Sequence, residues 1–317
     1  MFKALTIYRL AKAWYPEIGL IEASLDAARF TPCGATQDKS MGWIAPRGED
    51  HGALAESVNG QVILRLAIET KSVPGEAVRK EADAAAEHIE QTTGRKPGKK
   101  QMKELREDAL LNLLPAAFPK RTDVLVWIDR ERGLLMTDAS SQGKIDDVIT
   151  MLVRASDDLN LTLLNTVITP QTAMTAWLST LASDDEDGGA PGEFSIEREC
   201  ELKSGGEEKS VVKFTRHNLA TDEVRKHITE GKLPTKVAMS WNGRVAFVLT
   251  EAMALKKIDF LEGVFDDSRS DSADSFEADV ALSTGELRQL IPALVDALGG
   301  ELVISAGLPV APEGGDL

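Results

Sequence analysis

The sequence lacks the residues that mark several classes of protein. Only two of its 317 residues are cysteines, Cys33 and Cys200, which is too few for a disulfide framework or a cysteine-rich zinc site. No apolar run reaches the roughly 20 residues that a membrane-spanning helix needs. The first residues are interrupted by Lys3 and Arg9 and lack a signal-peptide cleavage pattern. We therefore expect a reducing, cytoplasmic setting and no membrane partner.

Positive charge is also scarce. The chain has 36 Lys+Arg against 51 Asp+Glu, a formal net charge of -15, which argues against a uniformly basic coat for nucleic acid. The stretch GRKPGKKQMKELR, residues 94–106, nevertheless contains six basic residues and one acid, Glu104. The distribution of charge is therefore more informative than its sum.

Common catalytic motifs are missing as well. The basic stretch is not a phosphate-binding P-loop, because Gly94 and Gly98 are one residue too close and Lys99 is followed by Lys100 instead of Ser or Thr. The four histidines show no metal-ligand spacing, and there is no G-x-S-x-G nucleophile motif. The sequence thus predicts no enzyme, no cofactor and no metal.

One function that the sequence leaves open is that of a magnesium-dependent nuclease. Glu201 and Lys203 lie two residues apart on a predicted strand, in the arrangement that some such nucleases use. That chemistry needs a further carboxylate on a neighbouring strand, and the nearest upstream acids, 184–187, lie in a predicted linker. Alternating charges on an exposed strand face explain the pair more simply. A second function left open is that of an acidic protein that binds other proteins and makes no contact with DNA.

Strand and helix patterns follow one another without regular βαβ alternation, which predicts an α+β fold with mixed or antiparallel sheets. The predicted strands are 4–10, 41–46, 61–70, 123–129, 133–139, 194–202, 210–216, 235–241 and 244–250. The predicted helices are 16–29, 142–155, one starting at Thr169-Pro170, one starting at Thr221, and one after a capping box of Ser283 and Glu286. Asn242-Gly243 predicts a type I′ hairpin turn.

The same patterns divide the chain into domains. Residues 1–72 and 118–180 form a predicted N-terminal α+β domain, and 194–300 form a C-terminal one. An acidic, Gly/Pro-rich linker, 181–193, separates them, and 301–317 is a predicted flexible tail. Residues 73–117 are predicted to insert a helical hairpin into the first domain.

The hairpin is predicted from the spacing of its apolar residues. Val78, Ala82, Ala85 and Ile89 recur at helical intervals, and the rhythm resumes at Met102 after the 94–100 break. This arrangement places the basic stretch at a projecting tip. Such a tip is either a solvated surface or a contact for phosphates, which lysine and arginine neutralise without reading sequence.

Other basic residues alternate with strand hydrophobics and can line one polar face of a sheet. If the chain binds nucleic acid, we predict that six of these residues contact its phosphates as a set: Lys120, Arg121, Lys213, Arg216, Lys236 and Arg244.

An ordered set of short motifs resembles the recombination-associated RdgC family of bacteria. It comprises YRL, FTPCG, MGWIAPRG, LLPAAFPKR, VWID, GLLMTDASS, TKVAMSW and TGELRQLIPALVDALGGE, from Tyr8 to about Glu301. The resemblance implies a non-enzymatic, nucleoid-associated protein that binds double-stranded DNA without sequence preference. It further implies a ring-shaped homodimer that encircles duplex and limits access of the RecA recombinase.

Two short segments correspond to dimer contacts of the family. Phe118, in LLPAAFPKR, matches an aromatic residue at one contact, although a core phenylalanine at the base of the hairpin is an equal alternative. Arg216 and His217, in VVKFTRHNL, match a Lys-Gln pair near the other contact. Histidine in place of glutamine changes the hydrogen bonds available there.

Overall fold

The structure is a computed structural model that describes residues 2–10, 17–156, 158–181, 189–206, 209–261, 264 and 275–302. The chain forms two compact units, which we call the central unit (residues 12–160) and the terminal unit (residues 1–11 and 161–317). The domain boundaries predicted from the sequence differ from the boundaries of these two units, and they remain a prediction. Most of the predicted linker 181–193 and of the predicted tail 301–317 lies outside the described residues.

The central unit is built on an antiparallel sheet in the order β2-β4-β5-β6, with β3 also paired to β4. The bounds of these strands are β2 Lys39–Ile44, β3 Ala55–Val58, β4 Gln61–Lys71, β5 Pro119–Asp129 and β6 Leu134–Thr137. Strand β4 is buried on both faces over most of its length, so its apolar run forms the centre of the core. Buried Trp127 on β5 donates from Nε1 to Gln61 Oε1 on β4 at 2.8 Å.

Helices α1 (Ile18–Asp26) and α4 (Gln142–Ala155) complete this core. Helix α1 contacts both β3 and α4. Helix α4 has the bounds predicted from the sequence, and it buries Ile145, Val148 and Leu152 at helical spacing.

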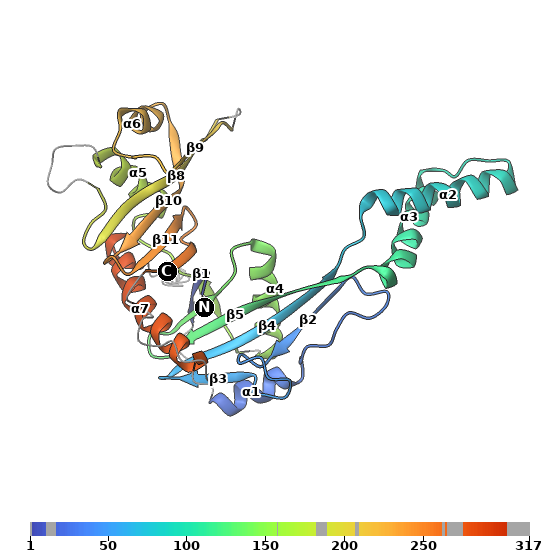
Figure 1. The fold of residues 1–317 in the computed structure, drawn as a ribbon, viewed down its shortest axis with the longest axis horizontal. Coiled ribbons are helices and arrows are strands. Elements are labelled where there is room, and N and C mark those ends of the chain that lie inside the picture. The colour runs from blue at the N-terminus through green and yellow to red at the C-terminus, as the bar shows by residue number, and fades with distance from the viewer. Residues whose placement is uncertain are drawn as a thin grey trace, which may run out of the picture. The chain divides into compact units, whose positions relative to one another are not determined.

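Helices α2 (Gly75–Thr93) and α3 (Lys99–Leu113) also belong to the central unit, and a short 3-10 helix, Leu114–Ala116, follows them. They contact each other and lie beyond the ends of β4 and β5 (Figure 1). Gly94 ends α2 in the left-handed conformation, with φ of 68°, which glycine adopts without strain. All six basic side chains of residues 94–106 are exposed. Within these two fully described helices only Ala82 and Ala109 are buried.

The terminal unit contains a second antiparallel arrangement, in the order β1-β12-β11-β10-β8-β9, with β7 also paired to β1. The strands are β1 Ala4–Leu10, β7 Leu161–Leu163, β8 Phe194–Ser204, β9 Val211–Thr215, β10 Lys232–Trp241, β11 Val245–Thr250 and β12 Leu255–Phe260. Asn242 and Gly243, with φ of 49° and 62°, join β10 to β11, which confirms the predicted turn.

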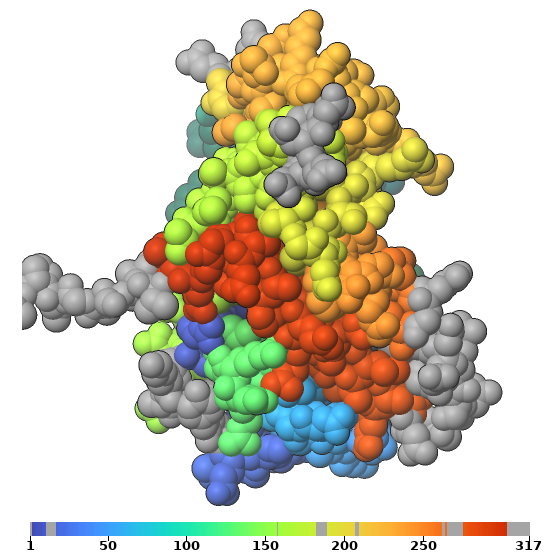
Figure 2. Space-filling model, turned by 90° about the vertical axis from the view of Figure 1, so that its left-hand side faces the viewer, coloured from blue at the N-terminus to red at the C-terminus, as the bar shows by residue number. Residues whose placement is uncertain are grey.

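Three helices complete this unit: α5 (Pro170–Thr180), α6 (Asp222–Thr229) and α7 (Ser275–Ala297). The Thr169 hydroxyl accepts a hydrogen bond from the Thr172 backbone N–H at 3.2 Å, so the predicted helix start is confirmed. Helices α5 and α6 contact β10. Figure 2 shows α7, in red, as a continuous band on the face turned to the viewer.

The fold is therefore α+β with antiparallel strand pairing and, within the described residues, seven α-helices. Strands β3, β7 and β12 were not predicted, because each is short or carries few apolar alternations. The predicted capping box is wrong. Ser283 and Glu286 lie inside α7, where the Ser283 hydroxyl donates to a backbone carbonyl of its own helix and Glu286 binds Arg244. A capping box and a mid-helix Ser-x-x-Glu have the same sequence, so only packing distinguishes them.

Candidate nucleic-acid interface

One face of the terminal unit's sheet carries charged side chains from β8, β9 and β10. On β8, Cys200 and Leu202 are buried, whereas the alternate residues Glu199, Glu201 and Lys203 are on the opposite face. On β10, Val237 is likewise buried next to half-exposed Lys236. The period of two along each strand therefore separates an apolar face from a charged one.

Glu201 is the centre of this charged face. Its carboxylate accepts hydrogen bonds from Lys236 Nζ at 3.0 Å to each oxygen and from the Thr235 hydroxyl at 2.9 Å. Lys213 Nζ, on β9, lies 3.1 Å from Glu201 Oε2. Two of the six predicted DNA-contacting residues are thus brought together, and an acid from the strand between them joins them. We call Glu201, Lys213 and Lys236 the Glu201 cluster.

The cluster keeps its acid ionised. Burial opposes ionisation of Glu201, but the hydrogen bonds from Lys236, Thr235 and Lys213 outweigh it and lower the pKa of Glu201 to about 2. The carboxylate is therefore negative throughout the physiological pH range, and the cluster carries a net charge of +1, from two lysines and one glutamate.

Glu199, the neighbouring acid on the same face of β8, also forms an ion pair. Lys257 on β12 donates to both oxygens of Glu199, at 2.6 and 2.9 Å. Lys257 has φ of 51°, an uncommon conformation for a residue other than glycine, at a position in β12 close to an irregularity in its pairing with β11. Each of these two glutamates of β8 is therefore held by at least one lysine from another strand.

Arg216 and His217 follow β9. Arg216 is exposed and has φ of 55°, and within the described residues it forms no ion pair. The His217 ring lies 5.3 Å from the ring of buried Phe214, and its backbone N–H donates to the Arg198 carbonyl at 3.1 Å. The His217 Nδ1 atom is buried without a hydrogen-bond partner among the described residues. This orphaned nitrogen is a polar group that an additional partner would satisfy.

Arg244 is placed differently from the other predicted DNA contacts. It follows the β10–β11 turn, and its guanidinium donates to both carboxylate oxygens of Glu286 on α7, with Nε 2.9 Å from Oε2. This pairing raises the pKa of Arg244. The guanidinium of Arg244 is thus paired with the largely buried carboxylate of Glu286, and the ion pair joins α7 to the sheet.

The remaining two predicted contacts lie in the central unit on β5. Lys120 is exposed and, within the described residues, forms no ion pair. Arg121 Nε lies 3.0 Å from Asp123 Oδ1, and its guanidinium carbon lies 4.9 Å from the centre of the Phe30 ring. The cation–π contact orients Arg121, and its pairing with Asp123 reduces the net local charge.

Phe118 directly precedes β5 and is 92% exposed. The alternative of a core phenylalanine is therefore wrong. The Phe118 side chain leaves its apolar area in water, where it is available for a contact with a second molecule.

The sequence interpretation missed the acids that hold the basic residues. Four of the six predicted contacts have a carboxylate partner: Arg121, Lys213, Lys236 and Arg244. The alternating acids of β8 were visible in the sequence as one face of a strand, and that signal could have identified Glu201 as a partner for the lysines of β9 and β10. Nothing comparable pointed to Glu286.

The nuclease alternative has limited geometric support. Glu201 has three donors on its two oxygens, so a metal would have to displace ammonium groups to bind there. Among the described residues, no group of three or more His, Cys, Asp or Glu could hold a metal ion.

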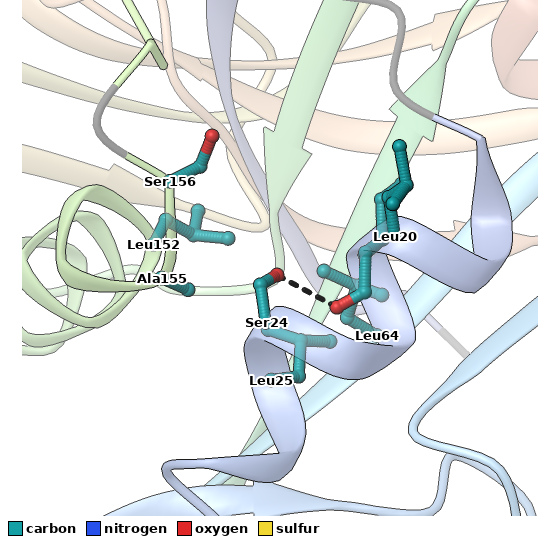
Figure 3. A pocket seen from close by; sticks show the side chains of 8 residues that line it. Leu20, Ser24, Leu25, Leu64, Leu152, Ala155 and Ser156 are labelled. Carbon is teal, nitrogen blue, oxygen red and sulfur yellow. Dashed lines mark hydrogen bonds between the residues drawn. The ribbon is translucent and has the colours of Figure 1, made fainter.

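A small pocket of about 110 Å³ lies between α1 and α4 in the central unit. Figure 3 shows Leu152 and Ala155 of α4 on one side of the pocket and Ser24 and Leu25 of α1 on the other. The Ser24 hydroxyl donates to the Ile21 carbonyl at 2.7 Å. The pocket is smaller than the roughly 300–1,000 Å³ of sites for drug-sized ligands, and its lining contains no acid or base. It therefore does not resemble an active site.

The family model described as "Putative exonuclease, RdgC" matches residues 1–301. The chain belongs to the RdgC family. It is 39% identical over 308 residues to the recombination-associated protein RdgC of Dechloromonas aromatica (strain RCB), covering 95% of this chain and 98% of that protein. RdgC proteins of Herminiimonas arsenicoxydans and Cupriavidus pinatubonensis (strain JMP 134 / LMG 1197) are 41% and 40% identical over 303 residues, with the same coverage.

Membership of the RdgC family associates this chain with proteins named for recombination. Within the described residues, no helix is long and apolar enough to cross a membrane.

Proposed function

We propose that the chain is a non-enzymatic protein that binds double-stranded DNA without sequence preference. The observation that carries this proposal is the Glu201 cluster, which presents two lysines on an exposed sheet face of a protein with a formal net charge of -15. Lys213 and Lys236 retain 67% and 41% side-chain exposure, so phosphates reach their ammonium groups. Lysine contacts to phosphates supply affinity without reading bases.

The protein acts as a homodimer that encircles duplex, is associated with the nucleoid, and modulates RecA-dependent recombination. The exposure of Phe118 supports a contact between copies, as do the left-handed backbone of Arg216 and the unpaired ring nitrogen of His217 among the described residues. A ring keeps acids on its exterior and places lysines toward the duplex. The α2–α3 pair projects into solvent as a helical hairpin, with its exposed basic residues available to the duplex.

A binding titration tests the proposal. Fluorescence anisotropy with two 30-base-pair duplexes of unrelated sequence should give similar affinities, which fall steeply as salt rises from 50 to 200 mM. K213Q/K236Q should bind both duplexes more weakly, by the same factor. No binding at low salt, or a strong preference for one sequence, would show that the proposal is wrong.

A magnesium-dependent exonuclease is the second candidate, because the matching family model carries that description and Glu201 and Lys203 share a strand face. Linear duplex labelled at either end should stay intact during prolonged incubation with magnesium. Shortening that is abolished by Glu201→Gln would establish the nuclease. Shortening that persists in Glu201→Gln would indicate a contaminant or another site.

The remaining alternative, an acidic interaction factor without DNA contact, predicts an effect on RecA without binding to duplex. Comparison of RecA filament assembly with wild type and K213Q/K236Q separates the two mechanisms. DNA competition requires the lysines, whereas a direct protein contact does not.

A further inference from the structure

The two lysines of the Glu201 cluster are bound to an acid within the same sheet. The carboxylate is only 18% exposed, whereas Lys213 is 67% and Lys236 is 41% exposed. The acid therefore lies beneath two ammonium groups that face solvent. An approaching phosphate meets the ammonium groups first and experiences the carboxylate directly behind them.

We propose that Glu201 limits the affinity of this face for phosphate, acting as an internal counter-ion of the two lysines. A carboxylate and a phosphate are both anionic acceptors for the same N–H donors. Lys236 directs its ammonium group to both oxygens of Glu201, so part of its hydrogen-bonding capacity is occupied before DNA arrives. The inference rests on the proposed function, since it concerns how strongly the same lysines bind DNA.

The surroundings show that Glu201 is a fixed counter-ion and not a transient neighbour. The Thr235 hydroxyl, which is buried, donates to Oε1, and this neutral contact holds the carboxylate in place when a lysine moves away. The strands on both sides of β8 contribute one lysine each, so the acid bridges three strands. The low pKa of Glu201 keeps the charge present at every pH at which DNA binding is measured.

Weak phosphate contacts are compatible with a protein that is retained on duplex by encirclement. Each contact then forms and breaks readily, and the protein moves along DNA without dissociating. Strong contacts from two uncompensated lysines would slow that movement. By weakening the contacts of Lys213 and Lys236 with phosphates, Glu201 therefore favours movement of the encircling protein along DNA.

The test compares Glu201→Gln with Asp296→Asn, a matched control. Both variants remove one negative charge from the terminal unit, but Asp296 is exposed near the end of α7 and its side chain forms no ion pair within the described residues. Glu201→Gln should bind duplex about 2- to 5-fold more tightly at 50 mM salt, the effect expected of one ion pair whose ammonium groups face solvent. Its salt dependence should steepen, by up to about 0.9 in the log–log slope for each additional phosphate neutralised. Asp296→Asn should change affinity less than 1.5-fold.

A third comparison separates the counter-ion role from a change in folding. In the K213Q/K236Q background, Glu201→Gln should have no effect on DNA affinity beyond that of Asp296→Asn, because neither lysine bound to Glu201 remains to be released. Unchanged or weaker binding by Glu201→Gln alone, while wild type binds, overturns the inference and leaves the proposed function in place. Failure of wild type to bind duplex at low salt overturns both.

Discussion

Arg244 and Glu286 form a bidentate ion pair between the sheet and helix α7, although they are 42 residues apart in sequence. Glu286 is only 9% exposed, so its charge is compensated mainly by this one guanidinium. Arg244 is also one of the predicted DNA contacts, and its ion pair with Glu286 gives it a second possible role in stabilising the fold.

Replacement of Arg244 by alanine should therefore lower stability more than DNA affinity. The replacement removes two charge-assisted hydrogen bonds from the largely buried carboxylate of Glu286, so the free energy of unfolding should fall measurably. Urea denaturation measures this loss, and Glu286→Gln should produce a smaller one because the amide retains one acceptor. A stability close to wild type with DNA affinity reduced several-fold would assign Arg244 to the interface instead.

Phe118→Ala should leave folding unchanged, because the side chain is 92% exposed and makes little contribution to the core. We expect its unfolding free energy, extrapolated to the monomer, to lie within about 0.5 kcal/mol of wild type. Sedimentation equilibrium should show a weakened dimer. Leu20→Ala is the matched control, since Leu20 is another exposed apolar residue of the central unit. Equal dimer affinity in both variants would contradict an interface role for Phe118.

The low pKa of Glu201 predicts a specific acid sensitivity. The pKa is lowered from 4.5 to about 2 in the folded protein, so the unfolded chain takes up the proton first as pH falls. The resulting stabilisation is complete above about pH 4.5 and is lost progressively as pH falls toward 2. Urea titrations between pH 6 and 3 should show a larger loss of stability in wild type than in Glu201→Gln. Parallel losses would mean that the carboxylate is not held by its lysines in solution.

The two cysteines should differ in reactivity. Cys200 is buried on β8, and burial raises its pKa to about 12. Cys33 is partly exposed, and burial together with the nearby Glu69 raises its pKa. Iodoacetamide at pH 8 should therefore modify Cys33 slowly and Cys200 only after denaturation, as mass spectrometry of tryptic peptides can show. Early modification of Cys200 in the folded protein would contradict its buried position.

Local features of the fold were predictable because neighbouring residues determine them. Helix α4, the Asn242-Gly243 turn and the Thr169 cap depend on helical spacing, positive φ and a hydroxyl acceptor, all of which are encoded within a few residues. The exposure of the basic stretch 94–106 also follows from its composition. The Ser283-Glu286 pattern failed because its short motif is equally compatible with a helix interior.

The sequence by itself determined most of the strands and helices, the alternation of charge along β8, and the resemblance of its ordered motifs to the RdgC family. Only the tertiary structure decided which acid compensates which base. The Glu201–Lys236 pair depends on the register of β8 and β10, which shifts at an irregularity between Pro234 and Lys236. The Arg244–Glu286 pair depends on the packing of α7. Charges on one strand face are a local property, whereas their net effect depends on side chains that reach them from distant parts of the chain.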